Sequence, residues 1–200
     1  MGMPPELLRN ISRDDVNALP IGRYEGEVVL VETPAQLERA MADLREERVA
    51  GFDTETRPAF KPGVSYSPSL AQLATARAVY LFPLQRHDFS RPLAELMASA
   101  RLVKAGVSVS DDLKQLEKVF PFERQSIVDL GTLVRRHGLK QSGVRNLSAL
   151  FLGFRIPKGA KTTNWAAPRL SPQQVLYAAT DAWACRELYV RFEELDLIEK

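Results

Sequence analysis

The sequence predicts an α/β domain built around a mixed sheet. Short apolar runs typical of strands alternate with amphipathic stretches typical of helices along most of the chain. Two of these runs, residues 69–76 and 78–84, are separated by Arg77 alone, which indicates a hairpin and some antiparallel pairing. A sizeable core is expected, because the 200 residues are 45% hydrophobic and 26% charged.

The pattern along the chain places the elements in order. Strands are expected at residues 27–32, 49–55, 69–76, 78–84, 101–107 and 126–130. Helices are expected at residues 34–47, 91–100, 110–120, 131–137, 145–152 and 172–195. Capping boxes with proline at the first helical position mark two helix starts, at Thr33 and Ser171. Residues 1–24 are expected to form an arm with a helix begun at Ser12, and residues 25–200 to form one domain.

Cysteine content and hydropathy exclude several classes of protein. The single cysteine, Cys185, rules out an internal disulfide and a multi-cysteine zinc site. No apolar run approaches the roughly 18–20 residues needed to span a bilayer, and residues 1–15 lack the apolar segment of a signal peptide. We therefore expect a cytoplasmic protein with no membrane partner.

The distribution of charge is more informative than the net charge of +2. No Asp or Glu lies between Asp129 and Asp181, while the rest of the chain carries 19 basic and 25 acidic residues. Segregated positive charge of this kind favours a polyanionic partner, although a solvated basic surface is the alternative. The acid-free segment contains eight basic residues: Arg135, Arg136, Lys140, Arg145, Arg155, Lys158, Lys161 and Arg169.

Two carboxylates stand together at the end of an apolar strand. The run Val49–Phe52 ends in Asp53 and Glu55, which are two residues apart and therefore share one face of the strand. Like charges placed side by side repel each other, so this arrangement needs a compensating group.

Helix geometry brings further acids toward the core. In the last helix, Asp181 shares a narrow sector with Tyr177 and with apolar residues, at about 100° per residue. In the helix at 110–120, Asp112 lies beside the apolar stripe, whereas Asp111 points well away from it. A neutral, hydrogen-bonded carboxyl is the alternative for Asp181, and a helix-dipole contact is the alternative for Asp112.

Convergence of these four acids would create a metal site. Asp53, Glu55, Asp112 and Asp181 come from three separate elements, and hard oxygen ligands select Mg²⁺ or Mn²⁺ over zinc. Two such ions about 3.5–4 Å apart can activate a water and stabilise the leaving oxygen in phosphodiester cleavage. The sequence therefore predicts a site for two divalent cations.

Three motifs resemble those of a known enzyme group. The segments GFDTET (51–56), KAGVSVSDDLKQL (104–116) and LYAATDAW (176–183) resemble the three exonuclease motifs of the DEDDy 3′–5′ exonuclease superfamily. The similarity is greatest to ribonuclease D-like proteins and to the exonuclease domain of the Werner syndrome protein, and it covers about residues 28–195. Many relatives have Asn four residues before the second-motif Asp, where this chain has Ser108.

The resemblance implies a ribonuclease H-like fold with a five-stranded mixed sheet flanked by helices. It also implies that residues 25–200 are a 3′–5′ exonuclease domain, in which the four acids bind two Mg²⁺ or Mn²⁺ ions. Tyr177 would orient the attacking water, and a nucleoside 5′-monophosphate would be released from a single-stranded DNA or RNA end. The expected substrate contacts are Thr54, Thr56, Lys158, Lys161, Asn164 and Trp165, with plain packing as the alternative for Trp165.

Two other functions remain open from the residues alone. A catalytically silent nucleic-acid-binding module on the same fold is one, although the complete acid set with Tyr177 argues against it. A phosphatase with an acidic strand-end motif is the other, although Glu55 stands where such a motif has Asp. The sequence does not choose between DNA and RNA.

Overall fold

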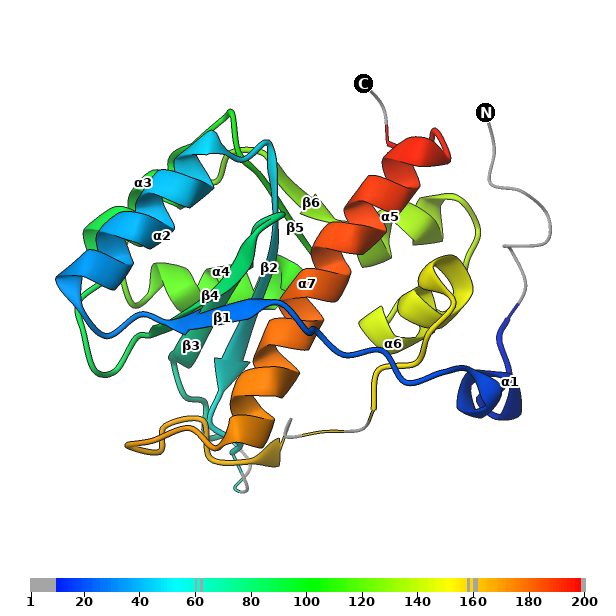
Figure 1. Cartoon of the computed structure of the whole chain (residues 1–200), viewed down its shortest axis with the longest axis horizontal. Helices are drawn as coiled ribbons and strands as arrows, with labels where there is room; N and C mark the ends of the chain where they lie inside the picture. Colours follow the sequence, from blue (N-terminus) through cyan, green and yellow to red (C-terminus); the bar gives the residue numbers. More distant parts are fainter. Residues whose placement is uncertain (1–9, 60, 62, 158, 160–161, 199–200) are drawn as a thin grey trace.

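A mixed sheet of six strands forms the centre of the protein (Figure 1). The computed structural model describes residues 10–59, 61, 63–157, 159 and 162–198. The α/β fold class is confirmed, but the sheet has one strand more than the five that the resemblance implied, because the short run near residue 128 pairs with its neighbour. In spatial order the strands are β1 (Glu27–Leu30), β4 (Ala78–Pro83), β3 (Pro68–Ala74), β2 (Val49–Thr56), β5 (Val103–Gly106) and β6 (Ile127–Asp129).

The pairing of these strands is mixed. β3 is antiparallel to both β2 and β4, so the expected hairpin is present. The β1–β4, β2–β5 and β5–β6 pairs are parallel. β2 lies inside the sheet, and its first four residues are all buried, because both of its faces are covered by helices.

Helices cover the two faces of the sheet. One face packs against three helices: α2 (Pro34–Glu46), α3 (Ser90–Ala98) and α4 (Val109–Glu117). The long helix α7 (Pro172–Glu194) crosses the other face, as Figure 1 shows. The expected capping boxes begin α2 at Thr33 and α7 at Ser171. Beside α7 lie α5 (Leu130–Arg136), α6 (Val144–Leu147) and a π-helical turn, η2 (Ser148–Leu152), in place of the single helix expected at 145–152.

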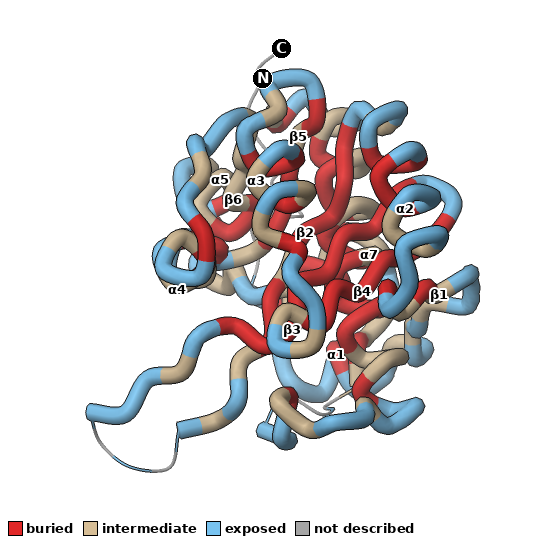
Figure 2. The backbone as a smooth tube through the Cα atoms, turned by 90° about the vertical axis from the view of Figure 1, so that its left-hand side faces the viewer, coloured by how far each residue is buried: buried red, intermediate tan, exposed pale blue. Residues whose placement is uncertain are grey.

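α7 lies directly on the backbone of β2. A Cβ atom at Gly51 would come within 1.9 Å of the carbonyl oxygen of Ala182, so only glycine permits this approach. Figure 2 shows the result as continuous buried backbone through β2 and α7. The helix that carries the third motif is therefore held against the strand that carries the first.

The N-terminal arm follows the surface of the domain. Its helix α1 (Arg13–Ala18) begins with a capping box at Ser12, where the sequence predicted a helix start. Ile11 and Val16 pack with Ala149 in a small apolar cluster. Within the part of the chain that the structure describes, no helix has the length and apolar character that crossing a membrane requires.

Candidate active site

The acids of β2 face α7. Asp53 is paired with Gln72 and Glu55 with Leu70 across the β2–β3 ladder. Leu70 packs in the apolar cluster under α7, and directly opposed residues of an antiparallel pair share a face of the sheet. Both carboxylates are thus placed on the face that α7 covers.

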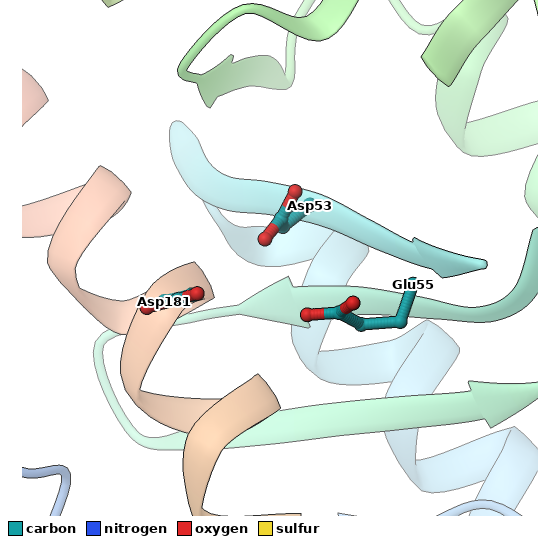
Figure 3. Close-up of side chains that lie close together, drawn as sticks. All are labelled: Asp53, Glu55 and Asp181. Carbon is teal, nitrogen blue, oxygen red and sulfur yellow. The ribbon is translucent and has the colours of Figure 1, made fainter. Parts of the chain in front are cut away.

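Asp181 of α7 completes a cluster of three carboxylates. Oxygen atoms of Asp53, Glu55 and Asp181 lie within 4.8 Å of one another. Figure 3 shows the three side chains directed toward a common point between β2 and α7. Glu55 and Asp181 are 7% and 5% exposed, so water screens their mutual repulsion poorly. The donor set of carboxylate oxygens fits a hard divalent cation of the Mg²⁺ or Mn²⁺ type.

Asp112 reaches the same cavity from α4. Its Oδ1 atom accepts a hydrogen bond of 2.9 Å from the Thr54 hydroxyl, which points to the opposite side of β2 from Asp53 and Glu55. Asp111 has an 89% exposed side chain and forms an ion pair with Lys114 at 2.8 Å. Helix geometry therefore distinguished the two neighbours correctly, with Asp112 facing the sheet and Asp111 facing solvent.

Tyr177 lies one turn before Asp181 on α7. Burial, and then the negative charges of Asp181 and Glu55, raise the pKa of its phenol well above the ordinary value. The hydroxyl thus stays protonated at neutral pH and is available as a hydrogen-bond donor. Its ring is held from two sides, because the Trp165 ring centroid lies 6.1 Å away and a Cβ at Gly159 would come within 2.2 Å of it.

These side chains line one cavity of about 950 Å³. Asp53, Glu55, Asp112, Tyr177 and Asp181 all contribute to its wall, as does Cys185. The Cys185 thiol is 2% exposed, and burial together with the nearby Asp53 and Asp181 charges raises its pKa. A protonated, buried thiol packs as a small apolar group, as the sequence indicated.

The expected substrate contacts divide into three groups. Thr54 lines the cavity but is 7% exposed and engaged with Asp112, so the structure gives it a positioning role. Trp165 is 2% exposed in the core beneath α7, which is the packing alternative to base stacking. Thr56 and Asn164 are not among the described residues that line the cavity. Lys158 and Lys161 lie outside the described residues.

The backbone at Ser108 explains one departure from the family pattern. Ser108 caps α4 in the left-handed conformation, with φ 61° and ψ 34°, and its N–H donates to Asp129 Oδ1 at 3.2 Å. Asn adopts this conformation more readily than most residues. The serine thus keeps the geometry of the α4 start without the residue type that favours it.

Sequence reasoning missed the opposite wall of the cavity. Residues of the arm (Ile11, Ser12, Arg13, Val16 and Asn17) and of the acid-free segment (Gln141, Gly143, Val144, Arg145, Asn146 and Arg155) contribute to it. The acid-free segment was noticed for its charge, but no local pattern shows that the arm packs against it. The contact joins residues 130 positions apart.

Comparison with known proteins agrees with this geometry. A family model described as 3′–5′ exonuclease matches residues 28–195. The bifunctional 3′–5′ exonuclease/ATP-dependent helicase WRN of Mus musculus is 32% identical over 154 residues, which cover 74% of this chain and 11% of the mouse protein. The chain therefore spans about a tenth of that relative's length.

Solved structures show the same fold. The Aedes aegypti Nibbler EXO domain is similar with a TM-score of 0.76 at 26% identity, covering 89% of this chain and 92% of that one. Escherichia coli RNase D, an exoribonuclease involved in structured RNA processing, gives a TM-score of 0.72 at 23% identity and covers 84% of this chain and 46% of its own. The fold is ribonuclease H-like, and the resemblance of the three motifs is confirmed. The chain belongs to the 3′–5′ exonuclease family.

Proposed function

We propose that the protein is a metal-dependent 3′–5′ exonuclease that hydrolyses the terminal phosphodiester bond of single-stranded DNA or RNA and releases nucleoside 5′-monophosphates. One observation carries this proposal. Acids from β2, α4 and α7 line a single cavity, and three of them place oxygen atoms within 4.8 Å of one another. Tyr177 lines the same cavity with its hydroxyl protonated.

The chain's own residues divide the work in the proposed reaction. Asp53, Glu55, Asp112 and Asp181 would hold two divalent ions, which when bound supply the charge that activates a water and stabilises the leaving 3′ oxygen. Tyr177 would donate its O–H to orient that water toward the terminal phosphate. Thr54 keeps Asp112 in place through their 2.9 Å hydrogen bond.

Phosphates of the strand would meet the basic segment. Lys158 and Lys161 belong to the interval without acids and are proposed to contact them, with Asn164 and Thr56 near the terminal nucleotide. Neutralising both lysines should weaken binding to all sequences alike and make the salt dependence shallower, by about one unit of slope for each lost phosphate contact. An unchanged slope would assign both lysines to solvated surface.

A degradation ladder tests the proposal directly. Matched DNA and RNA oligonucleotides, labelled at the 5′ or the 3′ end, are incubated with the protein and Mn²⁺. The expected result is a progressive ladder from the 5′-labelled strand and immediate release of labelled mononucleotide from the 3′-labelled one. Binding without degradation would identify a silent nucleic-acid-binding module. Release of free phosphate from a mononucleotide would identify a phosphatase.

A further inference from the structure

The N-terminal arm forms part of the cavity that holds the acids. The face of α1 and its cap that borders the cavity consists of Ser12, Arg13, Val16 and Asn17, while Asp14 and Asp15 are not among the lining residues. The arm therefore turns its basic and neutral residues toward the cavity. This arrangement suits an anionic ligand between the arm and the acid cluster, provided that cations occupy the cluster.

Backbone hydrogen bonds fasten the arm to the acid-free segment. Ile11 N–H donates to Gln141 Oε1 at 2.7 Å, and Gln141 Nε2 donates back to the Ile11 carbonyl at 3.2 Å. Farther along, Arg155 N–H donates to the Pro20 carbonyl at 2.9 Å, and Gly22 N–H donates to the Arg155 carbonyl at 3.0 Å. The position of Arg155 is thus set by the arm.

Two arginines at the cavity wall are oriented in the same way. Arg145 donates its Nε to the Ile156 carbonyl at 2.9 Å, and Arg155 donates its Nε to the Leu19 carbonyl at 3.2 Å. Neither forms an ion pair with an acid among the described residues, in contrast to Arg45, which binds Glu95 with two nitrogens. Each side chain is fixed through one nitrogen, and its two terminal nitrogens keep their donor capacity.

We infer that Arg145 and Arg155 form a clamp for backbone phosphates of the substrate strand, and that the arm positions Arg155 in this clamp. The inference rests on the proposed function and adds a binding site on the strand beyond the terminal phosphodiester. A guanidinium with free terminal nitrogens matches the geometry of a phosphate, and a nearly immobile one loses little entropy on binding. A phosphodiester strand also explains why the cavity combines a carboxylate wall with an arginine wall, since the metal ions and the clamp would contact different phosphates.

Substrate length separates the clamp from the catalytic centre. The p-nitrophenyl ester of thymidine 5′-monophosphate has one phosphodiester and no further phosphate, whereas a single-stranded decamer has several. Arg145→Gln and Arg155→Gln should each lower kcat/KM on the decamer about tenfold, as expected for a lost charge-assisted hydrogen bond, and leave kcat/KM on the ester unchanged. Arg136→Gln is the matched control, because Arg136 is an exposed arginine of the same segment that does not line the cavity. Equal losses on both substrates, or losses no larger than that of the control, would overturn the clamp.

A variant of the arm tests its positioning role. A Cβ at Gly22 would lie 2.1 Å from the Phe154 ring, so Gly22→Ala should displace the arm next to Arg155. We expect Gly22→Ala to lower decamer cleavage about as much as Arg155→Gln, and the double variant to lose no more than either single one. Additive losses would show that the arm acts independently of Arg155, and the positioning role would be rejected.

Binding in EDTA judges the clamp without catalysis. Fluorescence anisotropy of a labelled decamer should show weaker binding for Arg145→Gln and Arg155→Gln, with a log–log salt slope shallower by about 0.7 per variant, the value for one phosphate contact on a single strand. This result supports the clamp even if no cleavage of any substrate is found, in which case the proposed exonuclease function alone fails. Slopes equal to that of the wild-type protein would reject the clamp even for an active exonuclease.

Discussion

The hydroxyl of Thr54 on β2 donates to Oδ1 of Asp112 on α4 at 2.9 Å, so one hydrogen bond joins the first acidic motif to the second. Side chains alternate along a strand, and Thr54 therefore points to α4 while Asp53 and Glu55 point to α7. The bond fixes Asp112 at the edge of the cavity, where it supplements the three carboxylates gathered on the α7 side.

The neighbours Asp111 and Asp112 should respond oppositely to the same substitution. Asp112→Asn retains an oxygen for the Thr54 bond but removes the charge that a cation needs, so activity should fall by several orders of magnitude. Asp111→Asn should leave activity nearly intact, because its side chain is 89% exposed and contacts only Lys114 among the printed pairs. Circular dichroism should show both variants folded. Loss of activity in Asp111→Asn alone would contradict the assignment of the second motif.

Removal of divalent metal should abolish cleavage. Dialysis against EDTA is expected to inactivate the protein, and Mg²⁺ or Mn²⁺ to restore it. Ca²⁺ should bind yet support little cleavage, because its larger and looser coordination does not hold the close spacing of a two-ion centre. Cleavage that persists in EDTA would exclude the proposed mechanism.

Metal binding should also be visible in stability. A ligand that binds only the folded state stabilises it by about 2.7 kcal/mol at a concentration 100 times its Kd. Mn²⁺ should therefore raise the Tm of the wild-type protein, and Glu55→Gln should lose most of this increase because Glu55 belongs to the carboxylate cluster. Asp111→Asn serves as the control and should keep the full shift. A normal Mn²⁺ shift in Glu55→Gln would remove Glu55 from the ligand set.

Tyr177→Phe should separate water positioning from metal binding. The variant keeps the ring packed against Trp165 but lacks the hydroxyl. Misplacement of an attacking group by about 1 Å can reduce a rate about 10²-fold, so kcat should fall by roughly this factor while KM changes little. The Mn²⁺-dependent rise in Tm should remain. A lost rise would mean that the phenol supports the metal cluster itself.

Lys104 should give the protein a recognisable pH dependence. Lys104 is fully buried on β5, where its Nζ donates to the Ser99 carbonyl at 2.8 Å, and burial lowers its pKa to about 8. The unfolded chain keeps a lysine pKa of about 10.4 and so binds more protons between pH 8 and 10, which makes the free energy of unfolding rise with pH in this window by about 2 kcal/mol. Urea unfolding at pH 7, 8, 9 and 10 measures the rise. Lys104→Met should lack it, and an equal rise in this variant would assign the effect to other groups.

Local rules account for what the sequence predicted well. The capping boxes at Thr33 and Ser171 depend on residues three apart, and the pairing of Asp53 with Glu55 depends on residues two apart. The placement of Asp112 and Asp181 follows from the angle per residue of a helix. Each of these features is decided within one element, so the sequence contains all the information needed.

Features decided between distant elements were not predictable in this way. The order of strands in the sheet, the sixth strand, the burial of Trp165 and the contact of Ile11 with Gln141 all depend on packing across the fold. Gly51 illustrates the difficulty, because a glycine within an apolar strand carries no mark of the helix that will lie upon it. Only the assembled fold shows why that position excludes a side chain.

The docking of α7 on β2 also sets the moment at which the protein acquires its site. Asp53 and Glu55 are made early in synthesis, but Tyr177 and Asp181 belong to α7, which follows every strand of the sheet. A growing chain on the ribosome therefore has an incomplete cluster until α7 has emerged and has settled on Gly51. If the proposed function holds, a nascent copy of this nuclease is harmless to the messenger RNA from which it is being translated.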